Sequence, residues 1–139
     1  GFYFYNGNNW SPVAAANSGT KILCDFSFWP PSQIGELPAN VYDTHGLFVY
    51  RGTTIDGPMN SVTAIISANR QYQFRIYDIT NNKVIAETVL PSNNNPAPTI
   101  ITINTINNLP VGEAIFAIQM KCEVNSPECP KLYAVQIFQ

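Results

Sequence analysis

The single histidine of the chain is the first place to look for acid–base chemistry. His45 lies in the segment Tyr42-Asp43-Thr44-His45-Gly46, two residues after a carboxylate. Such a pair could act as a general base oriented by Asp43, or as half of a metal site. The alternative, which we favour, is a loop histidine beside a turn aspartate.

Other catalytic and metal-binding motifs do not occur in the sequence. There is no G-x-S-x-G nucleophile elbow, and the acidic residues form no D-x-D-x-D-G calcium loop. One histidine and three cysteines lack the spacing of zinc ligands. We therefore predict that the protein is not an enzyme and that it holds no metal and no cofactor.

The three cysteines are Cys24, Cys122 and Cys129. Cys122 and Cys129 flank a turn that contains proline. If the chain pairs with itself across this turn, their Cα atoms come within disulfide distance. We predict a Cys122–Cys129 bridge if the domain matures in an oxidising place, and three thiols otherwise. Cys24 has apolar neighbours in a predicted strand, so we expect it to be a buried free thiol.

Aromatic and amide side chains are grouped in two segments. Asn8 and Asn9 precede Trp10, and Trp29 and Tyr42 form a second group. Aromatic rings can stack on the faces of sugars while amides hydrogen-bond the hydroxyl groups. These five residues are therefore our candidates for a ligand-binding surface, although packing in a core or an interface would also explain aromatic residues near the N-terminus.

Apolar residues alternate with polar ones along most of the chain. In residues 71–80, Tyr72, Phe74 and Ile76 alternate with polar residues. This period of two predicts a strand with one buried face and one solvent-exposed face. Asn81 and Asn82 can adopt the left-handed backbone angles of a hairpin turn into a second strand over 83–90. Further strands are predicted at 21–29, ended by two prolines, and at 47–51, 61–68, 98–104, 113–124 and 132–138.

Helical periodicity is missing, and eleven prolines punctuate the chain. Short strands at regular spacing are typical of a sandwich or barrel. We predict an all-β fold: an antiparallel β-sandwich of jelly-roll type with about eight to ten strands.

Two of the predicted strands are apolar on both faces. One face of the strand at 114–120 carries Phe116, Ile118 and Met120. One face of the strand at 132–138 carries Tyr133, Val135 and Ile137. A second dry face requires another layer, a covering loop or another subunit. We favour a subunit contact, and therefore a homotrimer. The interface residues that we predict are Ile115, Ala117, Leu132 and Phe138.

Length and charge limit the class of protein. The 139 residues fit one domain spanning 1–139, which we expect to be excised from a longer protein because no signal peptide precedes its abrupt start. The net charge is -2, and the seven Lys and Arg residues are scattered, which argues against nucleic acid. No apolar run reaches 18 residues, so we predict no membrane span.

Two segments carry a resemblance to a known kind of domain. They are RIYDITNNKVIA at 75–86 and NLPVGEAIFAIQ at 108–119. Both resemble strand and turn motifs of the C-terminal jelly-roll heads, similar to tumour necrosis factor, of viral fibre or collagen-like surface proteins. The resemblance covers residues 22–138 loosely. It implies a trimeric head on a virion surface or outside the cell, although the chain has no Gly-X-Y repeat.

Three functions follow from these observations. The first is a non-enzymatic virion-surface or fibre head, used for structural assembly and for recognition of a host glycan or receptor. The alternative is a secreted lectin or carbohydrate-binding accessory module of cellular origin. The weakest is a small β-sandwich enzyme that uses Asp43 and His45.

Overall fold

The structure, a computed structural model, describes residues 3–5, 10–12, 21–33, 40–88, 95–123 and 130–139. Within these ranges the chain forms ten β-strands and no helix, which confirms the predicted all-β class. The strands are β1 (Tyr3–Tyr5), β2 (Trp10–Pro12), β3 (Ile22–Ser32), β4 (Asp43–Tyr50), β5 (Ser61–Ala68), β6 (Tyr72–Asp78), β7 (Lys83–Glu87), β8 (Asn95–Ile103), β9 (Ala114–Cys122) and β10 (Lys131–Phe138).

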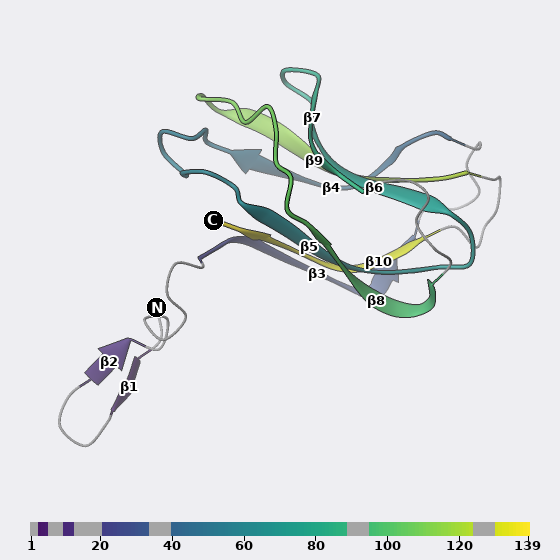
Figure 1. Ribbon diagram of the computed structural model, residues 1–139, viewed down its shortest axis with the longest axis horizontal. Helices are drawn as coiled ribbons and strands as arrows, with labels where there is room; N and C mark the ends of the chain where they lie inside the picture. Colours follow the sequence, from purple (N-terminus) through teal and green to yellow (C-terminus); the bar gives the residue numbers. More distant parts are fainter. Residues whose placement is uncertain (1–2, 6–9, 13–20, 34–39, 89–94, 124–129) are drawn as a thin grey trace.

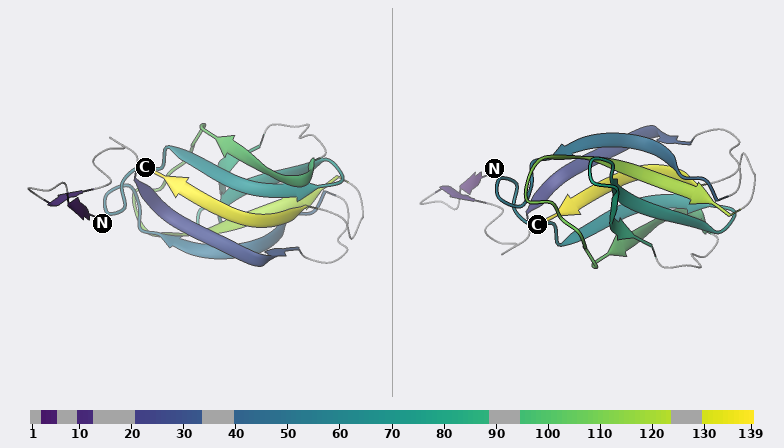
Figure 2. Two further views of the ribbon diagram at one scale, coloured as in Figure 1. Left: turned by 90° about the horizontal axis from the view of Figure 1, so that it is seen from below. Right: turned by 90° about the horizontal axis from the view of Figure 1, so that it is seen from above.

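Eight of these strands build two antiparallel sheets that pack face to face (Figure 1). One sheet has the order β3-β10-β5-β8, and the other has the order β4-β9-β6-β7. Figure 2 shows the first sheet face-on in its left view and the second in its right view. This pair of strand orders is that of a jelly roll, so the predicted fold is confirmed. In it β3 and β4 are edge strands of different sheets, although they follow each other in the chain.

The core lies between the sheets and takes alternate residues from each strand. Tyr72, Phe74 and Ile76 have no exposed surface, as their spacing predicted. Burial of a large apolar side chain contributes about 1.5–3 kcal/mol, so these three positions alone bind β6 firmly to the core. The predicted inner face of β9 is buried as well, in Phe116, Ile118 and Met120.

A chain of aromatic rings joins the sheets near the β3 and β4 edges. Phe26 of β3 lies 5.4 Å from Phe48 of β4, measured between ring centroids. Phe48 meets Phe116 of β9 edge to face at 5.6 Å, and Tyr50 stacks on Phe116 at 5.0 Å. These contacts fasten the edge strands β3 and β4 to each other and to β9. Edge strands benefit from such packing because each has a hydrogen-bonded neighbour on one side only.

The hairpin between β6 and β7 turns earlier than predicted. The strand ends at Asp78, whose carboxylate accepts hydrogen bonds from the backbone N–H and the side-chain Nδ2 of Asn81. Of the two predicted left-handed residues, Asn82 has a positive φ, at 55°. Asp78 has no exposed surface. Its side chain therefore shapes the turn by replacing backbone hydrogen bonds, as Asp does in turns.

Prolines do not end the strands where the sequence suggested. β3 continues through Pro30 and Pro31 to Ser32, and β8 includes Pro96 and Pro98. Both β3 and β8 are edge strands. Proline lacks a backbone N–H, and a strand edge that pairs on one side only can accommodate that loss.

A β-bulge in β10 changes which of its residues face the core. Leu132 pairs with Ile66 of β5, but Ala134 pairs with Ile65, so Tyr133 is an extra residue between them. The alternation therefore slips by one position. Leu132 has no exposed surface and packs in the core, so the prediction that it lies on the second, outward face is wrong.

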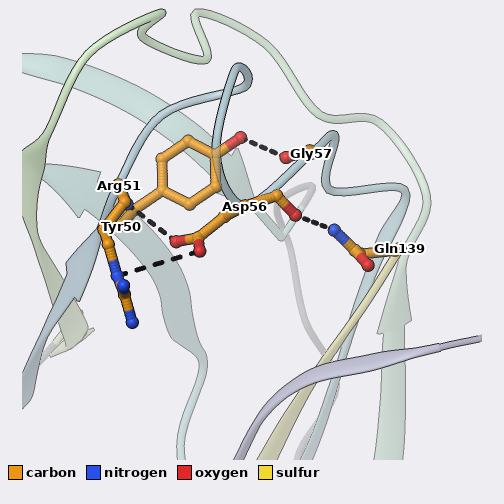
Figure 3. Close-up of polar contacts among 5 residues, drawn as sticks. All are labelled: Tyr50, Arg51, Asp56, Gly57 and Gln139. Atoms are coloured by element: carbon orange, nitrogen blue, oxygen red, sulfur yellow. Dashed lines mark hydrogen bonds and ion pairs between the residues drawn. The ribbon is translucent and has the colours of Figure 1, made fainter.

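The loop between β4 and β5 is held by Asp56 (Figure 3). Its carboxylate accepts a hydrogen bond of 2.8 Å from the backbone N–H of Arg51. Its backbone carbonyl accepts a hydrogen bond from the side-chain amide of Gln139. The Tyr50 hydroxyl donates to the Gly57 carbonyl at 2.5 Å. The loop is thereby fastened to β4 and to the residue that follows β10.

Strands β1 and β2 pair with each other as a separate two-stranded sheet. Figure 1 shows this hairpin beyond the end of the sandwich at which the C-terminus lies. Among the described residues there is no helix with the length and apolar character that a membrane span requires.

Candidate functional site

The start of β4 carries the segment around His45 and presents polar groups to both sides of its sheet. Asp43 pairs with Met120, which is buried in the core, whereas Thr44 pairs with Gln119 on the outer face. His45 is the extra residue of a β-bulge between Thr44 and Gly46. It therefore lies in a strand, and the interpretation of His45 as a loop histidine is wrong.

On the inner side, Ser32, His45 and Asp43 form a polar chain that we call the interior bridge. His45 Nε2 lies 2.7 Å from Asp43 Oδ2, and His45 Nδ1 lies 2.8 Å from Ser32 Oγ. The side chain of His45 is 1% exposed and that of Asp43 is 14% exposed. Because Ser32 belongs to β3, the interior bridge connects the edge strands of the two sheets.

The interior bridge has the same three groups as a hydrolase triad: a hydroxyl, an imidazole and a carboxylate. A nucleophile must also meet a substrate carbonyl. Ser32 pairs with Leu132, which faces the core, so the side chain of Ser32 points between the sheets. The sequence also places no nucleophile elbow here. The arrangement is suited to satisfying buried polar groups and fastening β3 to β4.

On the outer side of the same sheet, Arg75 of β6 is enclosed by aromatic rings. Its guanidinium carbon lies 3.6 Å from the centroid of the Tyr42 ring and 4.2 Å from that of Tyr77. Lys121 Nζ lies 5.0 Å from the Tyr42 centroid. Arg75 Nε donates a 2.8 Å hydrogen bond to Gln119. We call these five residues the Arg75 cluster.

The surroundings of Tyr42 change its acidity. The pKa of the Tyr42 hydroxyl is raised to about 12: burial raises it most, the charge of Arg75 lowers it in part, and the charge of Glu87 raises it again. Tyr42 is consequently a neutral phenol at any physiological pH. It can donate a hydrogen bond as well as accept one.

Next to the Arg75 cluster the outer face becomes apolar. Val49 pairs with Ile115, and Leu47, two residues earlier in β4, lies on the same face. Ile79, directly after β6, donates its backbone N–H to the Ile115 carbonyl. We call Leu47, Val49, Ile79 and Ile115 the outer apolar band. Their exposed fractions are 58%, 55%, 42% and 46%, so each still has much of its surface in water.

The outer face of the β3-β10-β5-β8 sheet is different. It carries a shallow trough of about 240 Å³. Small and polar side chains make up most of its lining, with Ile100 as its most exposed large apolar residue. The residues that line the trough are Asp25, Ser27, Thr63, Ile65, Ile100, Ala134 and Gln136.

The four predicted interface residues do not share one surface. Leu132 lies in the core, and Ala117, although on the outer face of β9, has no exposed surface between Leu47 and Tyr77. The exposed Ile115 belongs to the outer apolar band. Phe138 is half-buried on the outer face of the other sheet, where it pairs with Ile22.

The predicted ligand-binding residues are also separated. Trp29 is 87% exposed in the second half of β3, and Tyr42 belongs to the Arg75 cluster. Trp10 lies in the β1–β2 hairpin beyond the other end of the sandwich (Figure 1). Asn8 and Asn9 lie outside the described residues.

The cysteines are in different states. Cys122 is disulfide-bonded and Cys24 is a free thiol. Cys129, the predicted partner of Cys122, lies outside the described residues. Cys24 is half-buried against the core, and burial raises the pKa of its thiol, with a further contribution from the charge of Asp56. In the described part of the chain no three His, Cys, Asp or Glu side chains converge as metal ligands would.

The Arg75 cluster was not found by sequence reasoning. Arg75 alternates with the core residues Phe74 and Ile76, so the period of the strand predicts that it faces outward, but Gln119 and Lys121 come from β9 and Tyr42 from the residue before β4. A signal was present in the alternation of Arg75 with Tyr77, since cationic and aromatic residues two apart in a strand share a face.

Comparison with known proteins gives no relative from which a function can be transferred. The chain matches no protein-family model, no curated protein and no solved structure.

Proposed function

We propose that this jelly-roll domain is a non-enzymatic head of a virion-surface or fibre protein, located on a virion or outside the cell. It assembles as a homotrimer and recognises a host glycan or receptor. The resemblance of residues 75–86 and 108–119 to such heads supports the class of protein. The observation that carries the proposal is the outer apolar band on the β4-β9-β6-β7 sheet.

Proteins that stay monomeric rarely expose contiguous apolar patches larger than a few hundred Å². The outer apolar band places four large aliphatic side chains on neighbouring strands, with Val49 and Ile115 directly paired. No residue of the band is charged. Closed rotational symmetry would let several copies bury the same face against one another.

The size of the band indicates how strong the association is. Burying about 40 Å² of apolar surface stabilises by about 1 kcal/mol, so four side chains contribute about 4 kcal/mol per subunit. Association costs about 4–15 kcal/mol in lost freedom before side-chain ordering is counted. The gain and the cost are comparable, so the assembly depends on concentration and is sensitive to loss of a single band residue.

Analytical ultracentrifugation of the chain at tens of micromolar tests this proposal. We expect a trimer for the unmodified chain and folded monomers for Val49→Asp and Ile115→Asp. Ile100→Asp is the matched control, because Ile100 is 68% exposed on the other sheet. Ile118→Asp should instead unfold the domain, because Ile118 is in the core. A monomeric unmodified chain would refute assembly through this band.

A secreted lectin or accessory carbohydrate-binding module is the second candidate. The observation that favours it is Trp29, a large aromatic side chain that is 87% exposed. Such a module need not be a trimer. A monomer that binds neutral sugars on a glycan array, and loses them on Trp29→Ala, would favour this candidate over a head domain.

A further inference from the structure

We infer that the Arg75 cluster binds the carboxylate of an acidic sugar. This inference rests on the recognition role proposed above and names the chemical class of its ligand. The cluster lies on the same sheet face as the outer apolar band and borders it, because Tyr77 and Leu47 pair with Ala117 from its two sides.

The guanidinium of Arg75 is held in a fixed orientation. Its carbon Cζ lies over the rings of Tyr42 and Tyr77, at 3.6 and 4.2 Å from their centroids, and its Nε donates to Gln119 Oε1. Gln119 is oriented in turn, because its Nε2 donates to Thr44 Oγ1 at 3.1 Å. A planar guanidinium recognises a carboxylate through its N–H edge, and prior immobilisation lowers the entropy cost of binding.

Arg75 lacks a carboxylate partner within the described residues. The ion pairs found there within 4.0 Å are His45–Asp43 and Arg51–Asp56. Glu87 sits opposite Arg75 in the strand register, but its Oε2 accepts a 3.4 Å hydrogen bond from Gln73 instead. A half-buried guanidinium that makes no ion pair within 4.0 Å keeps its N–H groups for an incoming carboxylate, and the bonds formed are charge-assisted.

A second cation strengthens this preference. Lys121 shares the Tyr42 ring with Arg75. The two cations and the carboxylate of Glu87 carry a net charge of about one positive unit. The neutral Tyr42 hydroxyl and the Thr44 and Gln119 side chains add groups that hydrogen-bond sugar hydroxyls. The site therefore combines one anion-binding position with neutral polar groups around it.

The position of the cluster favours a sugar over a peptide strand. Peptides that extend a sheet pair with the backbone of an edge strand. Arg75 instead lies on β6, which is an inner strand between β9 and β7. A compact ring that rests on the sheet face can reach Arg75 directly, whereas a strand added at an edge would be separated from β6 by β7 on one side, or by β4 and β9 on the other.

Titration calorimetry with the full chain tests the inference. The probes are 3′-sialyllactose, which has a carboxylate, and lactose, its neutral counterpart, with a sulfated disaccharide as a third. We expect 3′-sialyllactose to bind at least about tenfold more tightly than lactose, as loss of charge-assisted hydrogen bonds implies. Arg75→Gln should abolish this difference, and Arg75→Lys should reduce it because lysine lacks the guanidinium fork.

The matched control is Arg51→Gln. It removes the same charge from the opposite end of the sandwich, and we expect affinity within about twofold of the unmodified chain, as for exposed surface charges. Equal affinity for 3′-sialyllactose and lactose would overturn the inference. Binding that is unchanged by Arg75→Gln, or found with the sulfated disaccharide alone, would overturn it as well.

The mass of each variant in solution separates this inference from the proposed assembly. A monomeric chain that binds 3′-sialyllactose through Arg75 refutes the trimer and keeps the site. A trimer without acid-dependent binding keeps the assembly and refutes the site. If Arg75→Gln dissociates the trimer, the cluster belongs to the interface, and the carboxylate site is refuted.

Discussion

Ser32 and His45 belong to different sheets, and their side chains meet inside the sandwich with Oγ and Nδ1 2.8 Å apart. Asp43 completes this interior bridge on the other imidazole nitrogen. Each of the two edge strands is paired on one side only, so a polar link between them supplements the aromatic contacts of Phe26 and Phe48.

Replacing Ser32 by alanine should destabilise the domain. The change leaves a nitrogen of the buried His45 without its hydroxyl partner, which costs about 1–3 kcal/mol. Urea unfolding at pH 7 measures the change in free energy. Ser27→Ala is the control, because Ser27 is exposed on the outer face of the same strand and should change stability by less than about 0.5 kcal/mol.

The same variants test whether the interior bridge is catalytic. We expect no hydrolysis of 4-nitrophenyl acetate by the unmodified chain beyond that of Ser32→Ala. A rate that disappears in Ser32→Ala but persists in Ser27→Ala would show a working triad, and the non-enzymatic proposal would then fail.

Gly52→Ala should destabilise the domain more than an ordinary surface change. Gly52 has a φ of 91°, and a Cβ there would lie 1.9 Å from the Val111 carbonyl oxygen. The loops before β5 and before β9 would have to separate, at a cost of at least about 1–3 kcal/mol. Gly112→Ala is the control, because no atom lies within 4 Å of its added Cβ. Equal thermal midpoints for the two variants would contradict this account.

Cys24 should react slowly with a disulfide reagent such as DTNB at pH 8. Burial and the charge of Asp56 raise its pKa, so a smaller fraction is thiolate at this pH than for an exposed cysteine. Asp56→Asn should speed the reaction, because it removes the second cause. Unfolding in urea should restore an ordinary rate. Mass spectrometry that finds Cys24 in a disulfide would refute its assignment as the free thiol.

Tyr42 should remain un-ionised in the folded protein until about pH 12. The unfolded chain loses this proton near pH 10, whereas the folded chain keeps it until about pH 12. The contribution of Tyr42 to the free energy of unfolding is therefore full below pH 10 and declines as pH rises through about 12. Absorbance titration at 295 nm should show one fewer late-ionising tyrosine in Tyr42→Phe. A loss of amplitude near pH 10, with the late phase unchanged, would mean that Tyr42 is not buried in the Arg75 cluster.

The local alternation of the sequence determined the strands and most of the core. Tyr72, Phe74 and Ile76 could be assigned to the core because side chains alternate across a strand and only one set can face the other sheet. Three features escaped this reasoning. The bulges at His45 and Tyr133 shift the alternation, and the edge positions of β3 and β8 accept prolines that were expected to end or exclude strands.

The residues that approach one another across the fold were decided by the tertiary structure. Arg75 contacts Tyr42 because β9 pairs with both β4 and β6 and so places their outward side chains on one face of the sheet. Ser32 contacts His45 because the edge strands β3 and β4 face each other across the sandwich. Such contacts join positions 13 and 33 residues apart, and no periodicity encodes them. The order of strands in two packed sheets sets which side chains meet, and that order depends on how all eight strands bury their apolar faces together.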